Sequence, residues 1–272
     1  MSFDTHVHLE HAALGSPATA WANARAAGVD RLLAVGVGPA TWCETVAAAD
    51  AIGVDVALGI HPEVVPELDD ATLDAALAAL PARLVDARAI AVGECGLDGP
   101  SGDLDRQIAV LRAHLRIARE LSLPVCLHVF RVQERALAVV REAGPLPAGG
   151  VVHSYSGSAE LVRNWARLGF SFAFGGALTR RNARRPQLAA RAVPDELLLA
   201  ETDAPFQPAG EDARDRSHGE PADLPLVMAA IAAARGVDPA TVVALTDANA
   251  RRLFGPPRRD ALRGRTGSGG PP

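Results

Sequence analysis

The stretch Phe3-Asp4-Thr5-His6-Val7-His8 places two histidines two residues apart near the start of the chain. In a β-strand, side chains two residues apart point to the same face, whereas a helix would direct them to different sides. On a strand, His6 and His8 can therefore bind one metal ion together. The stretch predicts an opening strand that carries part of a metal site.

Apolar, β-rich runs alternate with longer segments of helical period along the rest of the chain, which is typical of a parallel sheet with crossover helices. The expected strands are 3–8, 31–37, 54–60, 89–94, 124–128, 150–153, 170–174 and 197–201. The expected helices are 18–27, 41–51, 70–80, 104–121, 133–142, 159–168, 182–192 and 224–235, with a short one at 239–253. About eight β/α units fit an α/β fold of the (β/α)8 TIM-barrel type better than an open doubly wound sheet, and no dinucleotide-binding glycine motif follows the first strand.

The end of the chain differs from this pattern. From Gly255 onward the sequence is rich in glycine, proline and arginine and has no apolar periodicity. Such a composition is typical of disorder. We therefore expect one barrel domain over residues 1–254 and a disordered basic tail over residues 255–272.

Composition excludes several classes of function. The formal net charge of -5 argues against a protein that coats nucleic acid by bulk charge, so an anionic substrate must be held locally. No apolar run approaches the ~20 residues that span a bilayer and no signal peptide precedes the first strand, which predicts a cytoplasmic protein without a membrane segment. The chain contains no lysine, which excludes Schiff-base catalysis and a carboxylated-lysine metal bridge. Nothing in the sequence indicates an obligate protein partner.

Active-site residues of a TIM barrel lie at the carboxyl ends of its strands. The polar residues at or just after the expected strand ends are His6, His8, His61, Glu94, His128, His153 and Asp203. Histidines and carboxylates together favour a mixed nitrogen and oxygen metal site. We expect Glu94 to bridge two ions, with His6, His8 and Asp203 on one and His128 and His153 on the other. Two ions about 3.5–4 Å apart can clamp both the attacking and the leaving oxygen of a phosphoryl transfer.

Several motifs resemble those of the TatD-type metal-dependent hydrolases, nearly from end to end. They are Asp4-Thr5-His6-Val7-His8-Leu9, Gly59-Ile60-His61-Pro62, Val92-Gly93-Glu94-Cys95-Gly96-Leu97-Asp98, His153-Ser154-Tyr155-Ser156-Gly157, Phe174-Gly175-Gly176-Ala177-Leu178-Thr179, Glu201-Thr202-Asp203-Ala204-Pro205 and Thr246-Asp247-Ala248-Asn249-Ala250-Arg251-Arg252-Leu253-Phe254. The resemblance implies a (β/α)8 barrel of the amidohydrolase superfamily, one or two divalent ions, and hydrolysis of ester bonds, with deoxyribonuclease activity known in the family.

The resemblance also implies roles for individual residues. The metal ligands that it implies are His6, His8, Glu94, His128, His153 and Asp203. Of these, Glu94 and Asp203 are the expected catalytic carboxylates, and Asp203 is the expected proton acceptor from water. His61 matches a position on the substrate side of the pocket. The metal can be Mg, Mn or Zn, because ligand type alone does not select among them.

The expected substrate-binding residues are His61, Arg131, Arg180 and Tyr155. The chain departs from the family pattern near two of the motifs. Gly99-Pro100-Ser101-Gly102 replaces an aromatic residue and a longer loop, and Val129-Phe130-Arg131 replaces the usual serine, arginine and acidic residue after His128.

Other polar residues are expected to be structural. A solvated helix face is the favoured interpretation for most of the arginines between 180 and 185. Arg180 is the exception, because it is the nearest of them to the end of the preceding strand. His11 and His114 are expected to be structural or surface residues, and His218 part of a loop scaffold.

Three hypotheses on function follow. The first is a divalent-metal-dependent phosphodiesterase or deoxyribonuclease of the 3′ exonuclease type, whose substrate is nucleic acid or another phosphodiester. The second is a carboxylic ester or amide hydrolase, such as an aminoacyl-tRNA deacylase, because an activated water can also attack a carbonyl. The third, a non-catalytic metal-binding scaffold, is disfavoured because every expected ligand is present.

Overall fold

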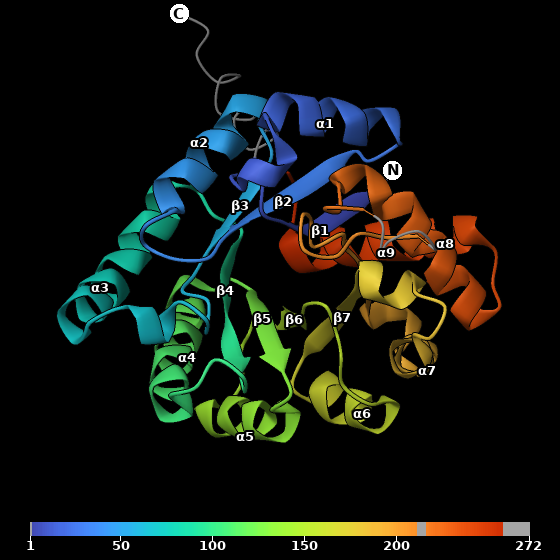
Figure 1. Ribbon diagram of the computed structural model, residues 1–272. Helices are drawn as coiled ribbons and strands as arrows, with labels where there is room; N and C mark the ends of the chain where they lie inside the picture. Colours follow the sequence, from blue (N-terminus) through green and yellow to red (C-terminus); the bar gives the residue numbers. More distant parts are fainter. Residues whose placement is uncertain (1, 211–215, 258–272) are drawn as a thin grey trace, which may run out of the picture.

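The computed structural model describes residues 2–210 and 216–257, and there eight parallel strands follow one another around a barrel (Figure 1). The strands are β1 (Phe3–Val7), β2 (Arg31–Gly36), β3 (Asp55–Leu58), β4 (Ala91–Asp98), β5 (Val125–Phe130), β6 (Gly150–Val152), β7 (Phe170–Phe174) and β8 (Leu198–Ala200). The helices are α1 (Pro17–Ala26), α2 (Trp42–Ile52), α3 (Asp70–Asp86), α4 (Leu104–Leu121), α5 (Gln133–Ala143), α6 (Ala159–Arg167), α7 (Arg184–Ala192), α8 (Leu224–Arg235) and α9 (Pro239–Phe254). Short 3-10 turns lie at Ala12–Leu14, Val65–Glu67, Gly176–Thr179, Asp195–Leu197 and Pro221–Asp223. The strand order β1 to β8 confirms the predicted (β/α)8 TIM barrel.

The first and last strands meet at the carboxyl end of the barrel. Val7 forms a parallel bridge with Ala204, and the N–H of His8 donates to the carbonyl of Ala204 at 2.9 Å. The N–H of Asp203 donates to the carbonyl of His6 at 3.0 Å. These bonds form a seam that brings residues from the two ends of the sequence side by side.

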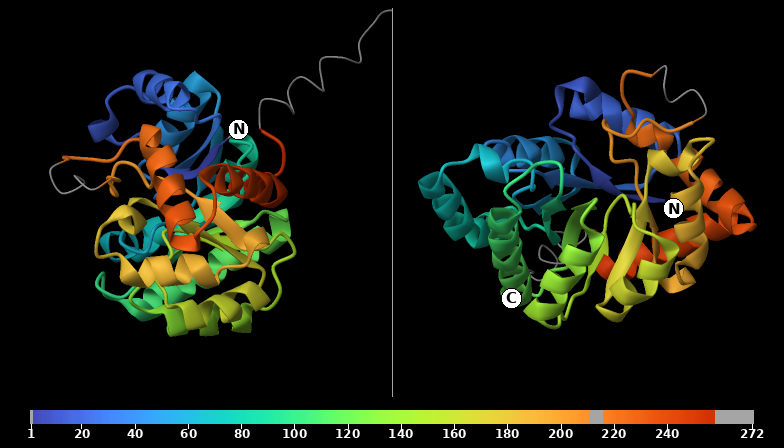
Figure 2. Two further views of the ribbon diagram at one scale, coloured as in Figure 1. Left: turned by 90° about the vertical axis from the view of Figure 1, so that its right-hand side faces the viewer. Right: turned by 60° about the horizontal axis from the view of Figure 1, so that its bottom comes forward.

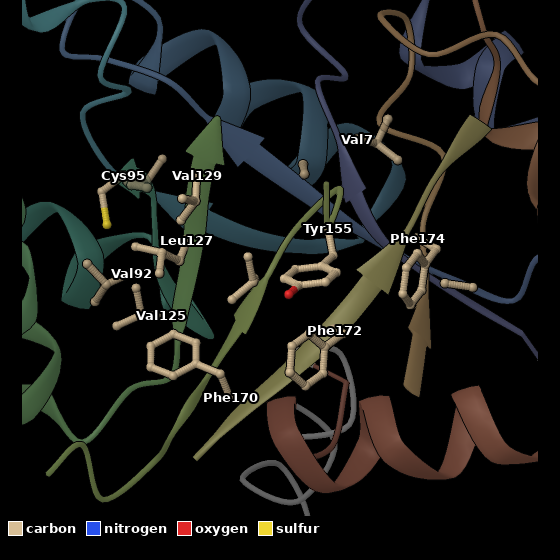
Figure 3. Close-up of a cluster of buried hydrophobic side chains, with 14 of the residues drawn as sticks. Val7, Val92, Cys95, Val125, Leu127, Val129, Tyr155, Phe170, Phe172 and Phe174 are labelled. Atoms are coloured by element: carbon tan, nitrogen blue, oxygen red, sulfur yellow. The ribbon is translucent and has the colours of Figure 1, made fainter. Parts of the chain in front are cut away.

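The barrel has an inner core and an outer core. The inner core takes side chains from every strand: Phe3, Leu33, Val35, Ala57, Ala91, Cys126, Val151, Ala173 and Leu199. The outer core lies between the strands and the surrounding helices, which two further views show on the outside of the barrel (Figure 2). In this layer Tyr155 packs edge-on against Phe172 and Phe174 (Figure 3). Because both faces of each strand are buried, the strands read as continuous apolar runs in the sequence.

Helix α9 covers the amino end of the barrel. Phe254 at its last turn packs edge-on against Phe3, with ring centroids 5.7 Å apart. The guanidinium of Arg31 lies over the Phe3 ring, donates to Asp55 at 2.5 Å and donates to the carbonyl of Gly255 at 2.8 Å. The opposite, carboxyl end of the barrel therefore remains for a functional site, as is usual in this fold.

Several predicted boundaries are wrong, including those of α3, β4 and α7. Helix α3 continues through Pro81 to Asp86, because its buried face of Leu73, Ala76 and Leu80 extends to Leu84. Strand β4 continues past Glu94 to Asp98, so Glu94 lies inside the strand and not at its end. Helix α7 begins at Arg184 and not at residue 182.

Two further predictions concern the tail and the membrane. Residues 258–272 of the predicted disordered tail lie outside the described residues. Within residues 2–210 and 216–257, no single helix is long and apolar enough to cross a membrane. Only Pro221–Arg235 and Pro239–Phe254 taken together meet the length and composition for a span, and they are bent by 110° relative to each other.

The buried histidine of α4 fixes the segment that follows β3. His114 is fully buried; its Nδ1 donates to the carbonyl of Val110 at 2.8 Å, and its Nε2 accepts the N–H of Ile60 at 3.0 Å. The ring must be neutral to accept that bond, and burial lowers the pKa of His114 to about 4. His114 is thus structural, and it anchors the residue next to His61.

We expect His114 to make the folded protein less stable in acid. In the unfolded chain this side chain takes up a proton near pH 6.5, whereas in the folded chain it does so only near pH 4. The contribution of His114 to the free energy of unfolding is therefore complete above pH 6.5 and declines as the pH falls to 4. We expect the stability difference between wild type and His114→Gln, measured by urea unfolding, to narrow by about 2 kcal/mol from pH 7 to pH 5. An unchanged difference would contradict this role.

Candidate metal centre

Seven polar side chains meet at the carboxyl end of the barrel, each brought there by a strand or by the turn that follows it. They are His6 on β1, His8 after β1, His61 after β3, Glu94 on β4, His128 on β5, His153 after β6 and Asp203 after β8. Glu94, His6 and His153 are almost completely buried. The structure therefore places all six residues predicted as metal ligands in one cluster, with His61 beside them.

Glu94 lies at the centre of the cluster and presents one oxygen to each side. Its Oε2 lies 3.0 Å from Nε2 of His6 and 3.6 Å from Nε2 of His8. Its Oε1 lies 2.7 Å from Nε2 of His153 and 2.9 Å from Nδ1 of His128. Two sets of imidazoles therefore flank one carboxylate, which is the arrangement needed for a carboxylate that touches two ions.

Asp203 completes the first of these sets. Its Oδ1 lies 3.4 Å from Nε2 of His8 and 4.0 Å from Nε2 of His6. Among the described residues, three groups of side chains each bring their possible ligand atoms within 4.8 Å of one another: His6, His8 and Asp203; His6, Glu94 and His153; and His61, Glu94 and His128. The donor atoms are imidazole nitrogens and carboxylate oxygens, which suit divalent cations.

The far nitrogen of two of the histidines is held by a neighbour. Nδ1 of His8 donates to the carbonyl of Val35 at 3.1 Å, and Nε2 of His128 lies 3.1 Å from Oδ2 of Asp98. Nδ1 of His153 lies 3.3 Å from Oε1 of Glu201 without the geometry of a hydrogen bond. Histidines that bind metal characteristically donate their other N–H as His8 and His128 do, which directs the free lone pair to the ion. The residues present fit a divalent metal site.

His61 has the opposite arrangement. Its Nδ1 accepts the N–H of Glu63 at 3.1 Å, so the neutral ring carries its proton on Nε2. That Nε2 lies 3.1 Å from Oε1 of Glu94 and 3.2 Å from Nδ1 of His128. His61 therefore presents an N–H donor to the cluster instead of a lone pair, which distinguishes it from His8 and His128.

The backbone of β4 explains how Glu94 reaches the centre. Gly93 and Gly96 have φ values of 140° and 154°, which few residues other than glycine adopt. A Cβ on Gly96 would lie 1.9 Å from the carbonyl of His128, so β4 and β5 pack more closely there than a side chain would permit. The pairing of the two strands shifts register between Val92 and Cys95, on either side of Glu94.

The cluster is electrostatically prepared for a cation. Burial acts to raise the pKa of Glu94, but His153, His61 and His6 together lower it well below its ordinary value. The pKa of Asp203 is lowered in the same manner, against the effect of burial, by its contact with His8 and by the other imidazoles. Both carboxylates are therefore anionic at neutral pH.

Asp4 has a different function from these two. Its carboxylate accepts the N–H of Thr202 at 2.9 Å and the hydroxyl of Thr202 at 2.6 Å, and burial raises its pKa to about 8. Asp4 thus joins β1 to the segment after β8, and it is not directed into the cluster of ligands.

Sequence reasoning missed three residues that support the cluster. Asp98 holds His128, and Glu201 lies beside His153 and accepts the N–H of Ser154. Gln207 donates its Nε2 to Oδ2 of Asp203 at 2.7 Å and to the hydroxyl of Ser154 at 2.5 Å, which leaves Oδ1 of Asp203 facing the histidines. Asp98 and Glu201 belong to motifs quoted above and lie close in sequence to predicted ligands, so they could have been predicted as supporting residues. Gln207 belongs to no such motif, and the sequence does not indicate its contact with Asp203.

Asp98 gives a prediction on metal affinity. We expect Asp98→Asn to weaken metal binding about 10- to 100-fold, because the amide no longer fixes the proton of His128 on Nε2. Titration calorimetry with Mn²⁺ measures this directly. Asp74→Asn, an exposed change on α3, is the matched control, and equal affinities of the two variants would refute the function given to Asp98.

Two cavities open onto the cluster. One of about 430 Å³ is lined by His128, His153 and Asp203 together with Arg180, Arg185 and Ser154. The other, of about 340 Å³, is lined by His8, His61, Glu94 and Phe206. Phe206 is 58% exposed and its ring packs edge-on against His8 at 5.2 Å.

The predicted substrate residues lie at different distances from the cluster. Arg180 and Tyr155 line the first cavity, but Tyr155 is almost fully buried and its hydroxyl donates to the carbonyl of Ser158 at 2.8 Å. Arg131 lines an adjoining cavity and not the one at the cluster. His61 lies directly at the cluster.

Comparisons with known proteins find relatives that match nearly the whole of this chain. Residues 3–255 match the model of a family described as TatD related DNase. An uncharacterized metal-dependent hydrolase of Bacillus subtilis strain 168, YabD, is 30% identical over 258 residues, which cover 93% of this chain and 99% of that protein. The 3'-5' ssDNA/RNA exonuclease TatD of Klebsiella pneumoniae strain 342 is 34% identical over 242 residues, 86% of this chain and 90% of that protein.

Solved structures also superpose on this chain over most of its length. YjjV of Escherichia coli K12, a TatD homologue, superposes with a TM-score of 0.85 at 27% identity and covers 94% of this chain and 98% of that chain. A TatD family hydrolase of Entamoeba histolytica has a TM-score of 0.81 at 16% identity, covering 94% of this chain and 98% of that chain, and shows the shared fold alone.

Proposed function

The chain belongs to the TatD-related DNase family and is a metal-dependent hydrolase, and on this basis we propose that it removes nucleotides from the 3′ end of single-stranded DNA or RNA. The observation that carries the proposal is the position of Glu94, whose two oxygens face two separate sets of imidazoles. Such a carboxylate suits a pair of ions acting on a phosphodiester.

We assign the ligands to two ions. His6, His8 and Asp203 would hold one, His128 and His153 would hold the other, and Glu94 would serve as a ligand to both. The ions are Mg, Mn or Zn. Residues 1–254 act as one catalytic domain. The match to the family model, over residues 3–255, supports this extent.

When bound, such ions would supply a lowered pKa of water and charge neutralisation at the phosphate oxygens. The side chains of this protein accept the proton and bind the phosphate. Oδ1 of Asp203 accepts the proton of the attacking water, while Gln207 holds the other oxygen and so keeps the carboxylate in place. Nε2 of His61 donates to a phosphate oxygen, and Arg180 binds the phosphate from the side of the larger cavity.

An assay of three substrates tests the proposal. The metal-loaded protein is given a single-stranded oligonucleotide labelled at its 5′ end, the model diester bis(p-nitrophenyl) phosphate, and an aminoacyl ester. We expect stepwise shortening from the 3′ end and slow cleavage of the model diester. Preference for the acyl ester would replace the nuclease by the deacylase. If Asp203→Ala matches wild type on every substrate, neither assignment stands.

A further inference from the structure

A further cavity adjoins the one at the metal centre. It has a volume of about 680 Å³, and its lining includes Phe130, Arg131, Arg135, Ser156 and Arg185. Phe130, Ser156 and Arg185 also line the cavity that reaches His128, His153 and Asp203. The two cavities therefore meet along these three residues, and a chain bound at the metal centre can continue from one to the other.

The linings of the two joined cavities are positively charged, although the protein as a whole carries a net charge of -5. Arg180 and Arg185 line the first, and Arg131, Arg135 and Arg185 line the second. Among the described residues, Arg131, Arg180 and Arg185 form no ion pair, while Arg135 lies 3.9 Å from the exposed Asp105. Glu134 is the acid in the second lining. This local excess of guanidinium groups matches a ligand with several phosphates.

The border between the cavities also carries an exposed aromatic ring. Phe130 is 38% exposed, and the guanidinium of Arg131 lies 5.0 Å from its ring centroid. Both residues lie at the carboxyl end of β5, Phe130 as its last residue and Arg131 directly after it. A phenylalanine face beside arginines is typical of surfaces on which bases of a single strand stack.

We infer that the second cavity is a subsite for the phosphate next to the scissile one, with the intervening base against Phe130. The inference rests on the proposed nuclease function and adds a substrate requirement to it. A substrate with one phosphodiester occupies the metal centre alone, whereas an oligonucleotide also contacts Arg131 and Arg135. The enzyme then favours single strands with two or more phosphodiesters.

The test compares substrates of different length on the same proteins. Arg131→Gln and Arg135→Gln are assayed with a single-stranded pentanucleotide and with bis(p-nitrophenyl) phosphate. We expect each variant to raise KM for the pentanucleotide about tenfold, the effect of one lost charge-assisted contact, with kcat and the model diester unchanged. The slope of log affinity against log salt falls by about 0.7. Arg116→Gln on α4, which lines neither cavity, is the matched control and changes neither substrate.

Binding of a 5′-fluorescein pentanucleotide, measured by anisotropy on the metal-loaded proteins, separates this inference from the proposed function. If wild type cleaves no phosphodiester, the proposed function fails and the binding difference between wild type and Arg131→Gln decides on the subsite. Equal losses on both substrates, or no loss on the pentanucleotide, would overturn the subsite while leaving the nuclease in place. Phe130→Leu gives an independent check, since it removes the ring and no charge.

Discussion

Asp203→Asn is expected to lower kcat for single-stranded oligonucleotides about 10²- to 10⁴-fold, the usual contribution of a general base. The asparagine keeps the shape of the side chain and an oxygen near His8, but it cannot take up a proton from the attacking water. The measurement is steady-state hydrolysis of the labelled oligonucleotide at saturating metal.

The control for this variant must separate chemistry from folding. Asp86→Asn, an exposed change at the end of α3, should retain wild-type kcat. Metal content after reconstitution is measured on both proteins, because Asp203 is also assigned as a ligand. A variant that loses kcat only in proportion to lost metal would show that Asp203 acts as a ligand and has no separate function as a base.

Removal of the metal should stop hydrolysis and also destabilise the fold. An ion present at about a thousand times its Kd stabilises the native state by about 4 kcal/mol, which corresponds to roughly 10 °C in Tm for a chain of this size. We therefore expect a chelator to lower Tm by that amount and added Mn²⁺ to restore both Tm and activity.

A variant that lacks part of the site shows whether this effect is specific. In the double variant His6→Ala and His8→Ala, the chelator should shift Tm much less, because one ion no longer binds. If Tm of wild type is the same with and without chelator, the cluster either holds no ion or holds it too weakly to matter.

Much of the fold followed from local patterns. Strands buried on both faces produce apolar runs such as Val125–Phe130, and the helices between them have a helical period, so their order predicted the barrel. The boundary errors arose where tertiary packing outweighs local preference. Pro81 reads as a helix end, yet Leu84 continues the buried face of α3 beyond it.

The candidate site was predictable to a similar extent. Barrel geometry brings strand ends together, so His8 and Asp203 could be placed near each other although 195 residues separate them in the sequence. The partners that orient the ligands could not be assigned in the same way. Asp98 lies near His128 only because β4 continues beyond Glu94 and pairs with β5, and that extension depends on two glycines whose effect appears only in three dimensions.

Which ring nitrogen of each histidine carries the proton could also be assigned only from the structure. His61 and His8 are alike in the sequence, each following a strand, yet one accepts a backbone N–H on Nδ1 and the other donates to a backbone carbonyl. Sequence spacing does not record which ring nitrogen is occupied, so the distinction between a donor and a ligand depends on the hydrogen bonds around each ring.

The seam between β1 and β8 has a consequence for how the protein is made. A ribosome completes His6 and His8 first and Asp203 much later, and the backbone bonds from His8 to Ala204 and from Asp203 to His6 join them across that interval. Contacts so distant in sequence form late in folding, because the loop between them must first be closed. The nascent chain therefore has no complete metal site and no hydrolytic activity until its last strand has emerged and docked beside its first.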